Sequence, residues 1–214
     1  MILQNFAVFE GCDGAGTTTQ REILRMRLEN EGVGGRAGTV FDTFEPTDGA
    51  IGKLLRSALS NSRQFTGETM AYLFAADRNE HIFGKNGILE RCKRGEITIC
   101  DRYVLSSLAY QGLVCGDELP ERLNKDFPAP ELLLFFDIDP EIAFKRIESR
   151  GKKKEIYEYI DFQIKVRESY KKLLPQCVQN GSIVELINAD APVEELAKKV
   201  WSSVQKMTMF RRGS

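Results

Sequence analysis

One glycine-rich segment near the start of the chain restricts the fold more than any other part of the sequence. An apolar run at 6–9 is typical of a buried strand, and helical periodicity begins near Thr18. The turn between them contains Gly11, Gly14 and Gly16. A strand that passes through such a turn directly into a helix indicates a phosphate-binding loop. Backbone N–H groups then surround an anion, and the helix N-terminus adds partial positive charge.

The segment matches the phosphate-loop pattern G-x-x-x-x-G-K-[ST] at every defined position except the lysine. Thr17 stands at the lysine position, and Thr18 supplies the hydroxyl that binds Mg²⁺ in such loops. Because the glycines, the strand and Thr18 agree, we favour a phosphate site over a plain strand-to-helix turn. The residues predicted to bind the phosphates of ATP are Gly11, Asp13, Gly14, Ala15, Gly16, Thr17, Thr18 and Thr19.

Cys12 lies inside this loop, close to the start of the predicted helix. A helix N-terminus favours a thiolate, because its partial positive charge stabilises the anion. We therefore expect a reactive thiol that bound nucleotide protects from alkylation. The alternative is a small side chain that only fills space.

Composition limits the classes of protein that the chain can represent. Its 214 residues predict a single domain over 1–210, followed by a tail at 211–214. The formal net charge of −1 argues against nucleic acid or an anionic membrane as a partner. Five scattered cysteines form no C-x-x-C pair, which favours reduced thiols in the cytoplasm. No apolar run approaches the length that spans a membrane.

Buried strands alternate with helical segments along the chain, which predicts a parallel sheet with helices on both faces. Further strands are expected at 37–44, 97–100, 131–137 and 183–187. Helices are expected at 18–29, 51–59, 67–94, 106–112, from 140, at 156–178 and at 193–207. The segment 114–130 is polar and contains prolines, so we predict an irregular connection there.

Charged residues follow the strand at 97–100 directly. Open α/β sheets bind their ligands at the carboxyl ends of the strands. We therefore expect Arg102 to be catalytic, rather than only to pair with Asp101. Thr18, Glu10 and Asp101 are candidate ligands of Mg²⁺.

Several segments, in the same order along the chain, resemble the thymidylate kinase family. They are 9–16 (its phosphate loop), 45–47 (its R-E-P segment), 73–78 (its thymine-binding helix), 101–112 (its D-R-Y…S…A-Y-Q-G stretch) and 150–158 (its lid). The resemblance implies a P-loop kinase fold with a five-stranded parallel sheet and a short lid at about 148–158. It also implies phosphoryl transfer from ATP to thymidine monophosphate with Mg²⁺, and a homodimer.

The resemblance also implies roles for individual residues, assigned by their positions in these motifs. Asp13 would accept a hydrogen bond from the deoxyribose 3′-hydroxyl, and Arg102 would bridge the phosphates. Arg150 in the lid would close on ATP and assist catalysis. The adjacent lysines at 152–154 suit a solvated loop as well as a lid.

The resemblance also assigns the base pocket. Phe74 would stack on thymine, Arg78 would donate to a thymine carbonyl, and Ser107 and Gln111 would line the pocket. Phe74 alone would more often be a core residue. Because Arg78 lies four residues further on, the two share a helix face, which favours base binding.

Two positions depart from the family pattern, and both remove positive charge. Thr17 replaces the loop lysine, and Phe44 stands where the R-E-P arginine would hold the acceptor phosphate. Loss of a charged partner of a buried phosphate typically costs several kcal/mol. Possible replacement cations are Arg21, Lys53, Arg150 and the lysines at 152–154.

Three hypotheses follow from these departures. The chain is a working thymidylate kinase whose charges are compensated. Alternatively, it is a nucleotide-binding or regulatory module with little transferase activity. The third is a kinase for another acceptor, such as an unphosphorylated nucleoside, because Phe44 suits an apolar neighbour better than a phosphate.

Overall fold

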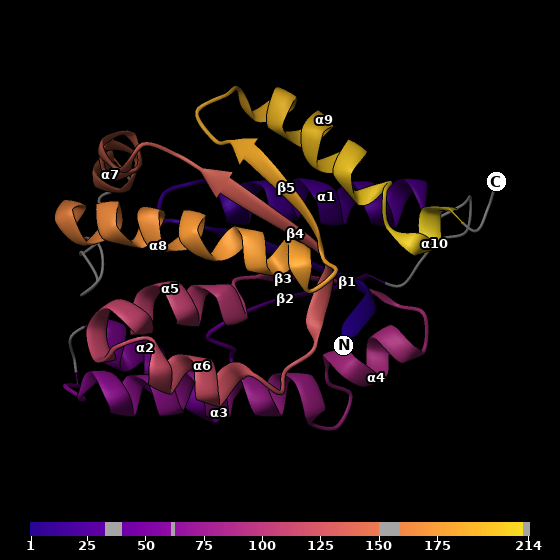
Figure 1. Ribbon diagram of the computed structural model, residues 1–214. Helices are drawn as coiled ribbons and strands as arrows, with labels where there is room; N and C mark the ends of the chain where they lie inside the picture. Colours follow the sequence, from indigo (N-terminus) through magenta and orange to yellow (C-terminus); the bar gives the residue numbers. More distant parts are fainter. Residues whose placement is uncertain (33–39, 61–62, 150–158, 212–214) are drawn as a thin grey trace.

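The computed structural model describes residues 1–32, 40–60, 63–149 and 159–211 (Figure 1). Five parallel strands form one sheet in the order β2-β3-β1-β4-β5. The strands are β1 (Ile2–Gly11), β2 (Val40–Phe44), β3 (Ile97–Asp101), β4 (Ala129–Asp137) and β5 (Ile183–Asn188). Because all run in one direction, their carboxyl ends share one edge of the sheet.

Helices cover both faces of this sheet (Figure 1). One face packs against α1 (Thr17–Glu31) and α9 (Val193–Val204), and the other against α4 (Ile88–Lys93), α5 (Val104–Cys115) and α8 (Ile160–Gln179). Further helices, some packed outside these, are α2 (Ala50–Leu59), α3 (Gly67–Phe83), α6 (Glu118–Asn124), α7 (Pro140–Ser149) and α10 (Thr208–Arg211). No helix in the described ranges is long and apolar enough to cross a bilayer.

The core is densest along β4, whose residues 132–136 are leucine and phenylalanine and are all buried. A continuous apolar run is typical of a central parallel strand, because helices cover both of its faces. Phe136 stacks on Phe9 of β1, with ring centroids 5.7 Å apart. This packing lies directly beneath the glycine-rich loop that follows β1.

The predicted α/β fold with a five-stranded parallel sheet is confirmed. The helical segment expected at 67–94 divides into α3 and α4 at Gly84 and Gly87, the two glycines that the sequence predicts to bend or split it. The irregular connection predicted at 114–130 is wrong, because it contains α6. Pro120 lies in the first turn of α6, where a missing N–H removes no helical hydrogen bond.

Some predictions fall on residues outside the described ranges. These are the start of the second strand at 37–39, most of the lid at 148–158, Arg150 itself, and the tail residues 212–214. The single-domain assignment stays a prediction.

We predict that Phe136→Ala lowers the free energy of unfolding by about 3–5 kcal/mol, because the cavity it leaves is fully buried. Val178→Ala is the control: Val178 is 56% exposed, so its change should stay within about 0.5 kcal/mol. Chemical denaturation measures both. Equal losses in the two variants would contradict the assignment of Phe136 to the core.

Candidate active site

Two positions at the turn from β1 to α1, Gly11 and Gly14, leave no room for a side chain. Gly14 has a φ of +82°, and a Cβ there would lie 2.6 Å from the carbonyl oxygen of Ala143. At Gly11, a Cβ would lie 2.8 Å from the carbonyl oxygen of Phe136. Gly16 forms the N-cap of α1, and no side chain caps it. The first N–H groups of α1 therefore point into the loop without a side-chain acceptor, which suits an anion.

Asp13, in the middle of the loop, is held by residues from distant parts of the chain. Its carboxylate accepts hydrogen bonds from Arg102, from Tyr110 at 3.3 Å and from Nε2 of Gln163 at 2.9 Å. The backbone N–H of Asp13 donates to Oε1 of the same Gln163, at 3.3 Å. Gln163 lies on α8 and is buried. It thus clamps both the backbone and the side chain of Asp13.

Arg102 follows β3 and adopts a φ of +68°, which is uncommon and strained outside glycine. This backbone conformation turns the guanidinium toward the loop, where it donates to the carbonyl of Gly11 at 3.1 Å. It also donates to the hydroxyl of Ser106, at 3.3 Å. Its ion-pair partner is Asp13 rather than the neighbouring Asp101.

Glu10 is fully buried at the end of β1. Its carboxylate accepts hydrogen bonds from the N–H of Tyr103 and the hydroxyl of Tyr170, and from both the N–H and the hydroxyl of Ser106. Burial raises its pKa, whereas the hydrogen bonds and Arg102 act in the opposite direction. Because these donors occupy both oxygens, Glu10 would have to give up a hydrogen bond to bind Mg²⁺, and its role as a ligand stays a prediction.

The other two candidate metal ligands lie side by side. The hydroxyl of Thr18 donates to Oδ2 of Asp101 at 2.8 Å. Oδ1 of Asp101 is buried and has no hydrogen-bond partner among the described residues. A hydroxyl beside a carboxylate with a free oxygen fits Mg²⁺, which binds proteins through one or two carboxylates and completes its shell with phosphate and water.

A cavity of about 120 Å³ opens beside the loop. Six of the seven residues that the sequence assigned to the acceptor line it, and Phe44 does not. The six are Asp13, Phe74, Arg78, Arg102, Ser107 and Gln111. Oε1 of Gln111 is buried and has no partner in the described structure. An unpaired buried acceptor in a cavity wall is suited to a ligand donor.

The guanidinium of Arg78 is surrounded by acceptors. It donates to Glu45, to the hydroxyl of Ser107, to the carbonyl of Tyr103 and to the side-chain oxygen of Asn124. Arg78 is 1% exposed, so these contacts fix its orientation at the wall of the cavity. A base carbonyl would therefore have to share or replace one of these acceptors.

Phe44 is the exception, because it is not among the residues that line the cavity. Two guanidinium groups flank its ring, at 5.4 Å for Arg21 and 5.3 Å for Arg56. Arg21 also contacts Asp42 and the carbonyl of Thr43 at the end of β2. Two guanidinium groups are therefore present around position 44, paired with Asp42 and Asp48, although Phe44 itself is apolar.

Among the candidates to replace the lysine missing at position 17, only Arg21 and Lys53 lie within the described residues. Arg21 is directed to the end of β2, and Lys53 is an exposed residue of α2. Arg150 lies outside the described residues. Within the described residues, Arg102 brings a guanidinium into contact with the loop.

His81, to which the sequence assigned no role, connects two parts of the site. Its ring nitrogens lie 2.7 Å from the hydroxyl of Thr43 and 3.1 Å from a carboxylate oxygen of Glu45. Glu45 in turn binds Arg78. His81 therefore supports the orientation of Arg78 indirectly. A lone histidine within a helical pattern carries no signal for such a contact.

The expectation of a reactive Cys12 is wrong. The side chain is 3% exposed, and burial raises the pKa of its thiol to about 12, with the Asp13 carboxylate acting in the same direction. Desolvation therefore outweighs the helix N-terminus. Cys12 fills space beneath the loop.

Comparison with known proteins agrees with this geometry. The family model described as thymidylate kinase matches residues 9–200. The chain belongs to the thymidylate kinase family. It is 42% identical to the "Putative thymidylate kinase" of Treponema pallidum, over 90% of each protein. It is 41% identical to a probable thymidylate kinase of Methanococcus maripaludis, over 80% of this chain and 78% of that protein. It is 35% identical to a probable thymidylate kinase of Pyrococcus abyssi, over 94% of this chain and 95% of that protein.

We predict that iodoacetamide modifies Cys12 at least about 100-fold more slowly in the folded protein than in denaturant at pH 8. With a pKa of about 12, the folded thiol is about one part in 10⁴ thiolate at that pH. Peptide mass spectrometry measures the rate at each cysteine. Partly buried Cys115 is the internal control. Modification of Cys12 at the denatured rate would contradict its burial.

Proposed function

We propose that this member of the thymidylate kinase family transfers the γ-phosphoryl group of ATP to thymidine monophosphate, giving ADP and thymidine diphosphate. One observation carries the proposal: Asp13 of the phosphate loop and Arg102 share a single cavity with Phe74 and Gln111. Phosphoryl transfer depends mainly on positioning and on charge near the transferring group. This arrangement brings a phosphate site and a base-sized pocket together.

The acceptor nucleoside would lie in the cavity of about 120 Å³. Phe74 would stack on thymine, a contact worth about 1–3 kcal/mol. Gln111 would accept a hydrogen bond from the base through its unpaired oxygen, and Arg78 and Ser107 would complete the base-binding wall. Asp13, oriented by Gln163 and by its other partners, would accept a hydrogen bond from the 3′-hydroxyl.

The loop N–H groups at the start of α1 would bind the phosphates of ATP. Thr18 and Asp101 are the residues that would hold Mg²⁺. When bound, the ion neutralises charge on the phosphate oxygens. Arg102, anchored by Asp13 and Ser106, would place its permanent charge between the donor and acceptor phosphates.

The surroundings of Phe44 support a phosphorylated acceptor over an unphosphorylated nucleoside. Arg21 and Arg56, each over the ring of Phe44, place guanidinium groups where the family pattern has an arginine. The face of the aromatic ring attracts each guanidinium group, which helps to hold both arginines at this position.

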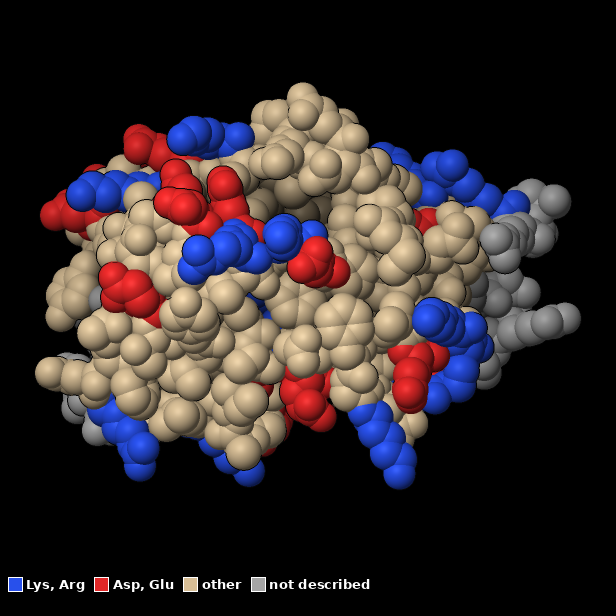
Figure 2. All heavy atoms as spheres, turned by 60° about the horizontal axis from the view of Figure 1, so that its bottom comes forward, with Lys and Arg blue, Asp and Glu red and all other residues tan. Residues whose placement is uncertain are grey.

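We further propose a homodimer and a cytoplasmic location. The exposed side of α3 carries Tyr72, Ala76 and Phe83, at spacings of four and seven residues, which place them along one side of the helix. The side of the molecule that lies at the bottom of Figure 1 has broad areas without charged side chains (Figure 2). An apolar stripe on such a face suits contact with a second copy. All five cysteines are free, which agrees with a reducing compartment.

The decisive assay measures ADP formation from ATP and Mg²⁺ with thymidine monophosphate or thymidine as acceptor, in this chain, in Thr17→Lys and in Thr17→Ala. We expect kcat/KM to be about 10- to 100-fold higher for the monophosphate, because charge-assisted hydrogen bonds bind its phosphate. Thr17→Lys should raise kcat about tenfold by adding a cation at the β- and γ-phosphates, and Thr17→Ala should change it little.

Other outcomes separate the alternatives. If Thr17→Lys left kcat unchanged, another cation would already act at the β- and γ-phosphates. Nucleotide binding without turnover in any variant would favour the binding module, and a preference for thymidine would favour a nucleoside kinase.

We predict that Gln111→Leu raises the KM for thymidine monophosphate about 5- to 150-fold, because a buried polar group of the base loses its partner at a cost of about 1–3 kcal/mol. The KM for ATP should not change. Gln205→Leu, an exposed glutamine at the end of α9, is the matched control. Equal KM values in the two variants would remove Gln111 from the acceptor site.

A further inference from the structure

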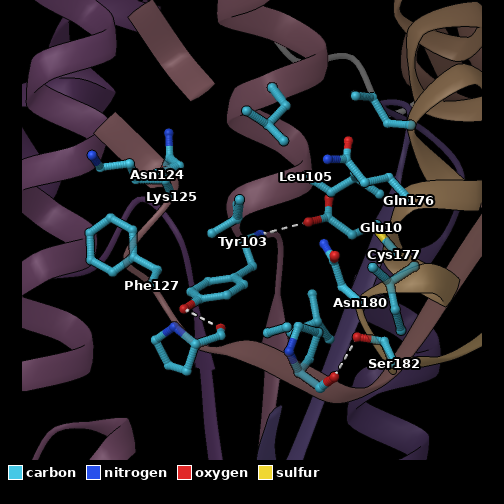
Figure 3. A pocket seen from close by; sticks show the side chains of 18 of the residues that line it. Glu10, Tyr103, Leu105, Asn124, Lys125, Phe127, Gln176, Cys177, Asn180 and Ser182 are labelled. Atoms are coloured by element: carbon cyan, nitrogen blue, oxygen red, sulfur yellow. Dashed lines mark hydrogen bonds between the residues drawn. The ribbon is translucent and has the colours of Figure 1, made fainter. Parts of the chain in front are cut away.

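A second and larger cavity lies behind the acceptor cavity, between α5, α6 and α8 (Figure 3). Its volume is about 400 Å³, against about 120 Å³ for the acceptor cavity. Much of its lining comes from the beginning of β4 and the end of α8, and Glu10 near the end of β1 also lines it. The proposed reaction does not use it. Pockets of this size commonly hold small molecules.

The wall of this cavity is mainly apolar, with Leu105, Leu108, Phe127, Leu133 and Leu173 among its residues. Polar side chains line it as well, and Asn124 and Ser182 among them are buried. Gln176 and Asn180 come from the end of α8, and Lys125 lies across from them (Figure 3). Glu121 of α6 and the buried Glu10 also line the cavity. A flat uncharged ring fits these surroundings, because the apolar wall would cover its faces.

The side-chain amides of Gln176 and Asn180 restrict the class of ligand further. A carboxamide offers a donor and an acceptor together, so it pairs with a heterocycle whose edge carries both. Gln176 and Asn180 are four residues apart, so they lie on the same side of the helix end. The ligand class that meets these conditions is an uncharged planar heterocycle of nucleobase size.

The second cavity shares a wall with the acceptor cavity. Tyr103 lines both, and its carbonyl accepts a hydrogen bond from Arg78 at 3.0 Å. Asn124 lines the second cavity, and its side-chain oxygen accepts a hydrogen bond from the same guanidinium. Arg78 lines the acceptor cavity. A displacement of Asn124 or Tyr103 would therefore reorient a residue of the acceptor site.

We propose that this cavity is a regulatory site for an uncharged planar heterocycle, which alters acceptor binding through Asn124 and Arg78. The coupling rests on the proposed function, whereas binding in the cavity does not. The two parts are therefore tested by separate measurements.

Binding is tested with 2-aminopurine, whose fluorescence reports its surroundings. Titrations contain saturating ADP, Mg²⁺ and thymidine monophosphate, so that the nucleotide sites are filled. We expect saturable binding of one molecule per chain, weakened about tenfold when Gln176 and Asn180 are both changed to Leu, since tenfold corresponds to about 1.4 kcal/mol. Gln205→Leu is the control and should bind as the unaltered chain does. No saturable binding, or binding unaffected by the double change, would overturn the proposal.

Cys177 reports where the probe lies, because it lines this cavity and is partly buried. N-ethylmaleimide modification is followed by peptide mass spectrometry with and without 2-aminopurine. The probe should slow modification of Cys177 and leave that of Cys115, which does not line the cavity, unchanged. Unchanged modification of Cys177 at saturating probe would place the binding elsewhere. Leu108→Trp, which should fill the cavity, should abolish protection.

Coupling is tested by the KM for thymidine monophosphate with and without 2-aminopurine. We expect a change of about fivefold with no change in the KM for ATP, a typical size for coupling between sites. In Asn124→Ala the KM should no longer respond to the probe, because the link to Arg78 is missing. An unchanged KM alongside proven binding would overturn the regulatory role. If the chain has no kinase activity, the binding and protection measurements still decide whether the site exists.

Discussion

The carboxylate of Glu10 has no exposed surface and is held by donors from two parts of the chain. Tyr103 and Ser106 approach from the start of α5, and Tyr170 from α8. Removing the partner of a buried hydrogen-bonding group costs about 1–3 kcal/mol, so these contacts hold the elements firmly in place. Ser106 also binds Arg102, and Arg102 binds Asp13. The proposed site therefore depends on a carboxylate that never needs to meet substrate.

Much of the fold could be predicted because its signals are local. The strand, turn and helix at the phosphate loop follow one another within 31 residues, and β4 shows its burial as an unbroken apolar run. The helix α6 was missed because proline was taken as a sign of irregular chain, although the first turn of a helix accepts it. Local patterns do not report which turn of a helix a proline occupies.

The acceptor residues could be predicted where they lie in contiguous motifs, as Phe74 and Gln111 do. Gln163, by contrast, is separated from Asp13 by 150 positions and lies in an ordinary amphipathic helix. Asn124 and His81 escaped notice for the same reason, because their roles exist only through contacts with Arg78 and Glu45. The prediction for Cys12 was wrong because it depends on burial, which residue order does not reveal.

The buried thiol of Cys12 has a consequence for the chemistry that the loop can survive. Oxidation by peroxide begins with the thiolate, so a thiol that stays protonated and covered reacts slowly. The partly buried Cys115 and Cys177 are more accessible to an oxidant. The thiol in the phosphate loop would then stay reduced while an oxidant reacts with the more accessible cysteines. Oxidation would modify the outer parts of this molecule before the loop.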